Sequence, residues 1–500
     1  MNPTTSRHHT VVVGAGMGGL AAAIDLARSG HKVTVIERAA QPGGKVHQQH
    51  VAGQPIDAGP TVFTMPWVFE SLFADAGQRF DQWVNATPCE ILARHAWTDG
   101  GRLDLFHDRS RSMAAISAFS GNADADGFGR WCHDSERRFD IMSQQFMSRE
   151  KPSLAGLVAR LLRHHRADLK HGLPVPSLWR MTQRYFEDPR LQQLFSRYAT
   201  YVGSNPIMTP STLMLISHVE QLGVWRLQDG MQSLANALER LARDFGSSLH
   251  YQSEVCAIKT NGNRVSGVEI DNGEILPADS VVFNGDHVAL NLLLRNGHRK
   301  TAQRRPFQQR GLSALTWCVS GKTSGFELDY HNVFFARDYR TEFDAISRHR
   351  TISSTPTVYV CAQDRGASEL PVDRERLLVL INAPAIADPD QWSAQIIADL
   401  RGRTEQVLEQ CGLRISANEA EWVATSPADW GERFPESDGS LYGAASHGTR
   451  AIFSRPGARH ATQGLYLAGG TVHPGPGVPM ATLSGRIAAQ ALLRDVQRSH

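Results

Sequence analysis

The spacing of hydrophobic and polar residues is clearest in the first forty positions of the chain. Residues 10–13 form a β-branched run of the kind that builds a buried strand in a parallel sheet. Residues 20–27 are mostly apolar and predict a helix that packs on this sheet. Residues 31–36 form a second strand, which ends at Glu37. This order of strand, helix and strand predicts an α/β dinucleotide-binding fold.

Strand-like runs separated by turn residues return in residues 245–290. An Asp-Asn-Gly turn at residues 271–273 lies between two β-rich runs, which indicates a hairpin. Residues 359–362 and 377–382 are apolar and β-rich, and we expect them to add strands to a separate, substrate-binding sheet.

Residues 120–245 have a helical pattern instead. One face of a predicted helix carries apolar residues three and four positions apart, at Leu154, Leu157, Val158, Leu161 and Leu162. The other face is basic, with Arg160, Arg163, His164, His165 and Arg166. Such a helix can lie on an anionic membrane surface, and it can equally pack its apolar stripe on the core with its cations in solvent. The pattern leaves both interpretations open.

Composition and charge narrow the class of protein. A chain of 500 residues predicts two or three packed subdomains rather than a single core. The formal net charge of +2 and the pI of about 8.2 argue against a nucleic-acid-binding protein. The six cysteines lie far apart without a C-x-x-C pair, so we expect neither a disulfide framework nor a metal site. The sequence lacks an apolar signal region and an uncharged run of about 20 residues, so we expect neither standard export nor a membrane span.

The loop between the first strand and helix carries the first candidate chemistry. Gly14 permits the tight turn, and Gly16 lets the backbone approach a pyrophosphate. Gly18 belongs to the same loop, and Gly19 lets the helix pack closely on the sheet, with its free N–H groups facing the phosphates. Glu37 follows Gly19 by 18 residues, where a carboxylate accepts hydrogen bonds from ribose hydroxyls and repels a 2′-phosphate.

Two later segments favour FAD over NAD as the dinucleotide. The loops after the second strand contain a glycine pair followed by a cation and then a rigid small-residue turn: Arg38, Gly43, Gly44, Lys45, Gly59, Pro60 and Thr61. Alone, the glycine pair could be a surface turn. Residues 464–470 add a strand with another glycine pair, followed by a loop and a helix predicted over residues 481–493. The start of that helix can direct N–H groups at a flavin, with Gly470, Val472, Pro479 and Met480 as candidate contacts.

In these segments the sequence resembles the bacterial carotenoid desaturases related to phytoene desaturase, within the amine-oxidase and Rab-escort-like FAD superfamily. The resembling residues are 11–19, 37–45, 57–61 and 466–483, with a further stretch between residues 223 and 286. Residues 58–65 and 472–480 look most like the branch that acts on 1-hydroxycarotenoids. Enzymes of that branch introduce the C3–C4 double bond on the route to spheroidene or spirilloxanthin in photosynthetic bacteria.

The resemblance implies an architecture and a cellular setting. A Rossmann-type FAD-binding domain is expected over residues 1–75, 245–290 and 460–500. A mixed-sheet substrate domain is expected over residues 76–120 and 291–459. A helical, membrane-facing subdomain is expected over residues 121–244. In the resembled family the backbone at the position of Val255 contacts the adenine. A long apolar carotenoid is the implied substrate. The implied location is cytoplasmic, peripherally attached to the inner or an intracytoplasmic membrane, without a nucleic-acid partner.

The sequence does not assign a catalytic residue. No catalytic triad, metal-ligand cluster or carboxylate pair stands out. His473 lies in the predicted flavin loop, where an acid–base role and a structural hydrogen bond are both open. The rival functions are a phytoene- or neurosporene-type desaturase, an amine or porphyrinogen oxidase, and a Rab-escort-like protein that binds prenylated partners without redox chemistry. The final electron acceptor and the oligomeric state are left open.

Overall fold

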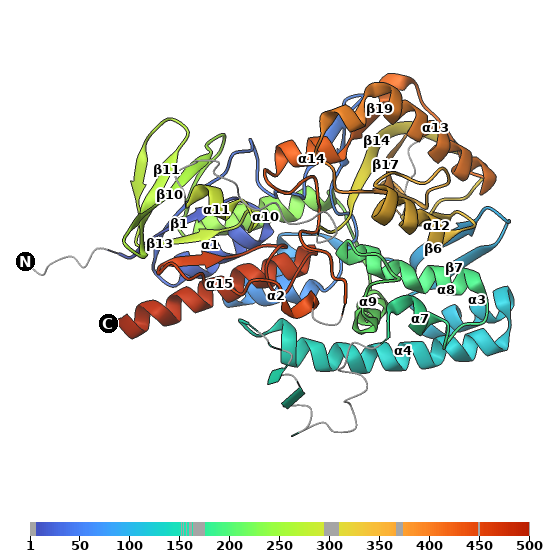
Figure 1. The fold of residues 1–500 in the computed structure, drawn as a ribbon, viewed down its shortest axis with the longest axis horizontal. Helices are drawn as coiled ribbons and strands as arrows, with labels where there is room; N and C mark the ends of the chain where they lie inside the picture. Colours follow the sequence, from blue (N-terminus) through green and yellow to red (C-terminus); the bar gives the residue numbers. More distant parts are fainter. Residues whose placement is uncertain are drawn as a thin grey trace, which may run out of the picture.

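The structure is a computed structural model of the chain. It describes residues 7–151, 153, 155–156, 158–159, 163, 176–294, 310–366, 374–448 and 451–499. The predicted helix with one basic face lies mostly outside these residues, since Leu154, Leu157, Arg160, Leu161, Leu162, His164, His165 and Arg166 are not described. The described elements form two units side by side, with helices packed below the second one (Figure 1).

A five-stranded parallel sheet forms the centre of the first unit. Its strands, in spatial order, are β20 (Leu465–Leu467), β13 (Ser280–Phe283), β1 (His9–Val13), β2 (Lys32–Ile36) and β9 (Ser248–His250). The strands predicted at residues 10–13 and 31–36 are therefore confirmed. Because β1 pairs in parallel with both β2 and β13, the loop that leaves β1 emerges at the carboxyl edge of the sheet.

Both faces of this sheet are covered, which explains why its strands are apolar throughout. One face packs against four helices: α1 (Met17–Arg28), α2 (Pro66–Asp75), α10 (Gly230–Asp244) and α15 (Val478–Ser499). The other face packs against an antiparallel sheet of β10 (Val255–Asn261), β11 (Arg264–Ile270) and β12 (Ile275–Pro277). Val12 and Val11 alternate between these two cores. The hairpin predicted around residues 271–273 is confirmed by the pairing of β11 with β12.

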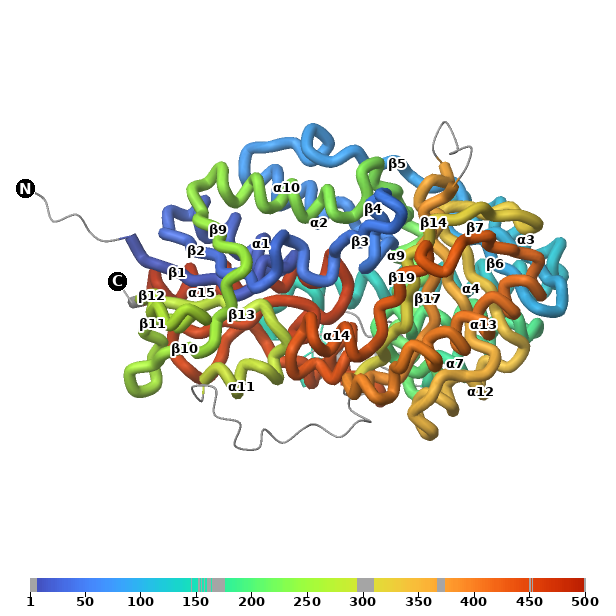
Figure 2. Tube along the Cα trace, turned by 90° about the horizontal axis from the view of Figure 1, so that it is seen from above, coloured from blue at the N-terminus to red at the C-terminus, as the bar shows by residue number. Residues whose placement is uncertain are grey.

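The position of α10 differs from the domain boundary that the sequence suggested. Its apolar stripe, including Leu234, Leu238 and Leu241, is buried in the core that also contains α1. Residues 230–244 therefore lie with the nucleotide-binding unit rather than with the helical subdomain (Figure 2). The reason is tertiary, since an amphipathic helix does not encode which apolar surface it covers.

The second unit contains a mixed sheet. Its strands in order are β18 (Arg414–Ser416), β14 (Ser313–Ser324), β17 (Glu375–Ala383), β16 (Val358–Ala362), β15 (His331–Phe335), β6 (Ile91–Trp97) and β7 (Arg102–Phe106), and β19 (Trp422–Thr425) also pairs with β14. β15 pairs with β6 in parallel, whereas the pairs on either side of these two strands are antiparallel. The strands predicted at residues 359–362 and 377–382 are confirmed as β16 and β17, at the centre of this sheet.

Helices cover the two faces of the mixed sheet differently. α13 (Ala394–Gln410) packs on one face through Leu400, Val407 and Leu408. The other face packs against the hairpin of β3 (Gln48–Val51) and β4 (Gln54–Asp57) and against a layer of helices. The helices of this layer are α3 (Arg109–Ser120), α4 (Asn122–Met142), α7 (Leu178–Thr182), α8 (Pro189–Ser196) and α9 (Leu215–Gln221). Further α-helices and strands among the described residues are β5 (Ala86–Pro88), β8 (Trp225–Leu227), α11 (Leu290–Leu293), α12 (Tyr339–Asp344) and α14 (Pro427–Arg433).

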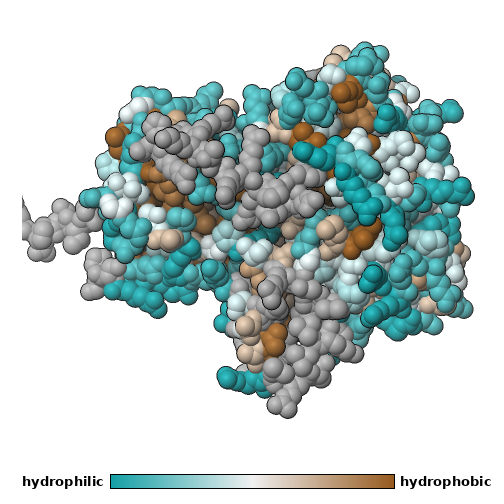
Figure 3. Space-filling view, viewed as in Figure 1, coloured by the Kyte–Doolittle hydropathy of each residue, from teal (hydrophilic) through white to brown (hydrophobic). Residues whose placement is uncertain are grey.

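Among the described residues, no helix has both the length and the apolar composition needed to cross a bilayer. On the face drawn in Figure 3, hydrophilic residues cover most of the described surface and hydrophobic residues form separate groups. The predicted contact of the helical layer with a membrane stays a prediction.

Candidate functional site

The glycine loop after β1 forms a turn in which the backbone segments touch. Gly14 has a φ of 97°, which favours glycine, and its N–H donates to the Ile36 carbonyl at 2.8 Å. A Cβ on Gly19 would lie 2.0 Å from the Gly14 carbonyl oxygen, so only glycine allows this turn and helix to pack together. Gly16 is the N-cap of α1 and makes no side-chain capping bond, which leaves the first N–H groups of the helix available to an anion.

Glu37 closes the other side of this loop. Its carboxylate accepts hydrogen bonds from the Ala15 N–H at 2.7 Å and the Ala39 N–H at 2.8 Å. Burial raises the pKa of Glu37, and the two N–H donors oppose that shift. Each carboxylate oxygen has two acceptor positions, so the group can still accept hydrogen bonds from a ribose.

The segment before β10 runs beside Glu37 and brings Val255 to this end of the site. The Ser253 N–H donates to the Glu37 carbonyl at 3.0 Å, and the Gln252 N–H donates to the Ala39 carbonyl at 3.1 Å. Val255 itself is 7% exposed and packs in the core shared with β1 and β2. Arg38 extends to the surface, where it lies 4.0 Å from Glu254.

The predicted glycine pair lies directly against the first loop. The Gly43 N–H donates to the Ala15 carbonyl at 2.9 Å, and a Cβ on Gly44 would lie 3.2 Å from the Gly16 Cα. Lys45 extends toward the second unit and donates to the Leu441 carbonyl. Burial lowers the pKa of Lys45 to about 8, partly offset by the charge of Asp286. The alternative of an isolated surface turn is thereby wrong.

The turn after β4 continues this path toward the mixed sheet. A Cβ on Gly59 would lie 1.9 Å from the Lys45 carbonyl oxygen, so Gly59 and the following Pro60 are held against the Lys45 segment. Thr61 is 5% exposed and shares a 2.8 Å hydrogen bond with the Tyr359 hydroxyl on β16. The predicted residues of this turn therefore lie at the junction of the two units.

The C-terminal segment completes the cleft from the opposite end of the sequence. α15 begins at Val478, one turn earlier than the sequence predicted, so Pro479 and Met480 lie in its first turn. A Cβ on Gly18 would lie 2.8 Å from the Ala481 carbonyl oxygen and 2.9 Å from the Gly469 nitrogen. The first turns of α1 and α15 thus meet at the carboxyl edge of the sheet.

Gly470 and Val472 follow directly after this meeting point. The Gly470 carbonyl accepts a hydrogen bond from Arg455 at 3.3 Å, and Val472 is 1% exposed.

Comparison with known proteins identifies this arrangement. A model of the family described as flavin containing amine oxidoreductase matches residues 17–493. A hydroxyneurosporene desaturase of Rubrivivax gelatinosus is 45% identical over 490 residues, covering 97% of this chain and 93% of that protein. A 1-hydroxycarotenoid 3,4-desaturase of a Flavobacterium species is 30% identical over 497 residues, covering 96% of this chain and 98% of that protein.

The chain belongs to the flavin-containing amine oxidoreductase family. Within this family it groups with the hydroxyneurosporene desaturases. A solved structure of a putrescine oxidase triple mutant with a redesigned cofactor site has a TM-score of 0.63 at 15% identity, covering 98% of this chain and 99% of that one. This likeness shows that the α/β amine-oxidase fold is shared.

FAD is the cofactor of this family, and the residues of the cleft fit it. The uncapped N-terminus of α1 and the glycine contacts suit a pyrophosphate, for which added Cβ atoms would leave no room. Glu37 suits the adenosine ribose, and the turn at Thr61 lies where an extended flavin would reach the mixed sheet.

The sequence analysis missed Asn284 as a structural residue of the cleft. Its side chain lies between the two glycine loops, donates from Nδ2 to the Gly14 carbonyl at 3.3 Å, and would be 2.8 Å from a Cβ on Gly469. One signal was available, because Asn284 follows β13 directly and therefore lies at the carboxyl edge of the parallel sheet.

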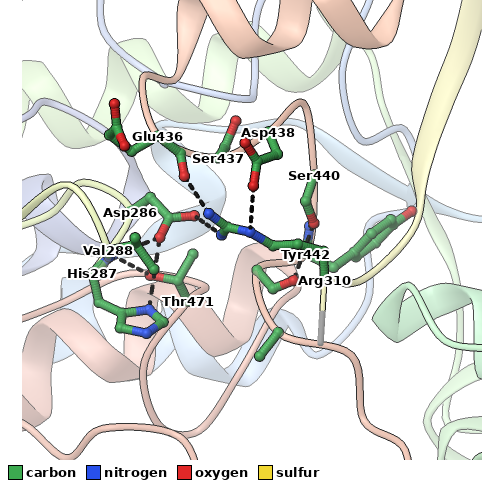
Figure 4. Close-up of polar contacts among 12 residues, drawn as sticks. Asp286, His287, Val288, Arg310, Glu436, Ser437, Asp438, Ser440, Tyr442 and Thr471 are labelled. Atoms are coloured by element: carbon green, nitrogen blue, oxygen red, sulfur yellow. Dashed lines mark hydrogen bonds and ion pairs between the residues drawn. The ribbon is translucent and has the colours of Figure 1, made fainter. Parts of the chain in front are cut away.

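A buried cluster of charged side chains links the two units (Figure 4). Arg310 is 7% exposed and lies 3.5 Å from Asp286, which follows β13, and 3.2 Å from Asp438 in a loop of the second unit. The Thr471 hydroxyl accepts a hydrogen bond from the His287 N–H at 3.2 Å in the same cluster. The sequence carried no signal for these pairings, since the partners are far apart along the chain.

His473 has a structural environment. Its Nε2 donates to the Phe146 carbonyl at 3.1 Å, and its ring packs edge-on against the Phe146 ring. Burial lowers the pKa of His473 to about 4, so the ring is neutral at physiological pH. Of the two roles left open by the sequence, this geometry favours the structural one.

Proposed function

We propose that this chain is an FAD-dependent desaturase that introduces the C3–C4 double bond into 1-hydroxycarotenoids. The observation that carries the proposal is the 45% identity with a hydroxyneurosporene desaturase over nearly the whole of both chains. The arrangement supports it, because the predicted flavin turn at Thr61 meets the largely apolar mixed sheet.

The proposed desaturation needs little acid–base catalysis by side chains. FAD, when bound, would supply the two-electron oxidation by which C3 and C4 together lose a hydride equivalent and a proton. The protein must hold the C3 and C4 hydrogens against the cofactor and exclude water. The partly buried side chains of Tyr359 and Leu380, on neighbouring strands of the mixed sheet, are candidates for contact with the substrate.

Two rival functions remain to be separated by experiment. A phytoene- or neurosporene-type desaturase would act on carotenoids without the 1-hydroxyl group. A Rab-escort-like protein would bind a prenyl group without a flavin, whereas this chain keeps the glycine contacts and Glu37 that suit FAD.

The decisive measurement is product analysis with defined substrates. The purified protein is expected to be yellow, to bleach with dithionite, and to form the 3,4-desaturated product from a 1-hydroxycarotenoid. Product from the unhydroxylated precursor alone would contradict the proposed substrate. Colourless protein that cannot be reconstituted with FAD would support the prenyl-binding alternative instead.

We place the protein at the surface of the inner or an intracytoplasmic membrane, on the cytoplasmic side, because of its substrate. Transfer of about 40 apolar carbons from water is worth on the order of 30 kcal/mol at roughly 0.8 kcal/mol per carbon. A carotenoid therefore does not diffuse freely through water, and the enzyme must take it from a lipid phase.

The basic helix predicted from the sequence is the proposed membrane contact. Replacing Arg160, Arg163 and Arg166 together with glutamine should release the protein from anionic liposomes, because each cation near such a surface contributes about 1 kcal/mol. Co-sedimentation with vesicles of anionic and neutral lipids measures this. The matched control is the exposed triad Arg340, Arg403 and Arg414, on α12, α13 and β18, whose replacement should leave sedimentation unchanged. Equal sedimentation of both triple variants would exclude the helix as an anchor.

A further inference from the structure

A chain of three hydrogen-bonded side chains joins the flavin turn to the middle of the mixed sheet. Thr61 Oγ1 lies 2.8 Å from the Tyr359 hydroxyl, and that hydroxyl lies 2.7 Å from Nδ1 of His331. Thr61 belongs to the turn after β4, whereas Tyr359 and His331 belong to the neighbouring strands β16 and β15. The chain therefore links the proposed cofactor contact to the sheet that would hold the substrate.

This chain has hydrogen-bonding capacity to spare. A tyrosine hydroxyl can donate once and accept twice, so Tyr359 retains one position after bonding to Thr61 and His331. His331 is 2% exposed, and its Nε2 has no hydrogen-bond partner among the described residues. Burial lowers the pKa of His331 to about 3, so the ring stays neutral. Buried polar groups are seldom left unsatisfied in a folded protein, and an unused one beside a cleft points to a ligand.

Tyr359 and two side chains near it are only partly buried. Tyr359 is paired with Leu380 on β17, and Asn382 follows two residues later on the same face. All three side chains keep some accessible surface, although they lie at the centre of a sheet whose two faces are covered.

The chemistry of the proposed substrate sets where its hydroxyl group must lie. The oxygen on C1 is separated from C3 by three bonds and from C4 by four, so it lies within about 4.5 and 6 Å of them at roughly 1.5 Å per bond. When C3 and C4 face the flavin, the hydroxyl group is therefore next to the flavin as well. A residue that recognises it must lie at the junction of the flavin turn and the sheet.

We infer that the Tyr359 hydroxyl, positioned by Thr61 and His331, binds the C1 hydroxyl of the substrate and is the specificity determinant for 1-hydroxylated carotenoids. This inference rests on the proposed function. An unhydroxylated carotenoid would leave the third hydrogen-bonding position of the Tyr359 hydroxyl unfilled, and sites built to bind a hydroxyl reject ligands that lack it. The same contact sets the position of C3 and C4 along the cleft.

The test compares Tyr359→Phe with the wild-type holoenzyme. The ratio of kcat/KM for a 1-hydroxycarotenoid to that for its unhydroxylated precursor should fall at least about tenfold, mainly through the hydroxylated substrate. Equilibrium binding of the hydroxylated product, followed by flavin fluorescence, should weaken by a similar factor. FAD content should stay at the wild-type level.

His331→Leu, which removes the partner that orients Tyr359, should shift both readouts in the same direction if Tyr359→Phe folds poorly.

The matched control is Tyr330→Phe, which removes a buried hydroxyl adjacent to His331 but outside the chain of three. It should keep the wild-type ratio and product affinity. Variants at Tyr359 and His331 that lower the melting temperature but keep both readouts would show that the chain only fastens the two units, and would overturn the inference. Wild-type protein that does not convert the 1-hydroxycarotenoid would instead refute the proposed function, so the two failures are distinguishable.

Discussion

Replacing Gly485 with alanine is expected to stop the chain from forming a stable FAD-binding holoprotein. Gly485 lies in α15 where this helix crosses α1, and an added Cβ would lie 1.9 Å from the Gly18 carbonyl oxygen. Gly18 and Gly485 both belong to the backbone of rigid helices, so α1 and α15 would have to move apart. Such overpacking should cost about 3 kcal/mol or more and disrupt the glycine loop beside it. Thermal unfolding and flavin content of the purified protein measure the effect.

The control for this substitution is Gly402→Ala in α13. Gly402 is also inside a helix, but it is exposed and has no atom within 4 Å of the added Cβ. Helix propensity alone predicts that each substitution stabilises the fold by about 1 kcal/mol. The two changes should therefore have opposite signs. A Gly485→Ala protein as stable and as yellow as the wild type would show that α1 and α15 do not pack as described.

Replacing Glu37 with alanine should weaken FAD binding by at least about a hundredfold. The substitution removes the acceptor for the Ala15 and Ala39 N–H groups, and it removes the proposed acceptor for the ribose. Hydrogen bonds from ribose hydroxyls to the charged carboxylate contribute roughly 1.5–3 kcal/mol each, so the loss of two of them accounts for a change of this size. Titration of apoprotein with FAD, followed by fluorescence quenching, gives the dissociation constant.

Glu254→Ala is the matched control for Glu37→Ala. Glu254 carries the same charge close to the site, but it is half-exposed and its partner Arg38 is 4.0 Å away. Its removal should change FAD affinity by less than about threefold, because exposed ion pairs contribute little. Similar losses in the two variants would mean that net charge near the cleft, rather than the specific bonds of Glu37, governs binding.

The cofactor half of the site could be predicted because its determinants are local. The segment from β1 to Glu37 contains a buried strand, a glycine turn, a helix and a second strand in one continuous run. Each of these preferences depends on residues a few positions apart, so the order of residues already specifies the loop geometry. The second glycine pair at Gly43 was predictable for the same reason, although only the structure shows that it touches Gly16.

Other features depend on contacts that a linear pattern does not record. α10 had a clear amphipathic pattern, yet its assignment to the nucleotide-binding unit depends on the surface of α1 that it buries. The environment of His473 depends on Phe146, which is 327 positions away, and the buried Arg310 cluster joins loops from both units. These contacts arise only when the chain is folded, because they are set by which packed faces meet.

By itself, then, the sequence determined the dinucleotide-binding fold, the choice of FAD and the candidate cofactor residues, since these follow from short-range spacing and turn chemistry. The tertiary structure decided which distant segments meet at the junction of the two units. Thr61 and Tyr359 are 298 positions apart and lie in different units, yet a single hydrogen bond joins them. The physical reason is that each unit buries its own apolar faces, and the polar residues left at the junction meet only after both have packed.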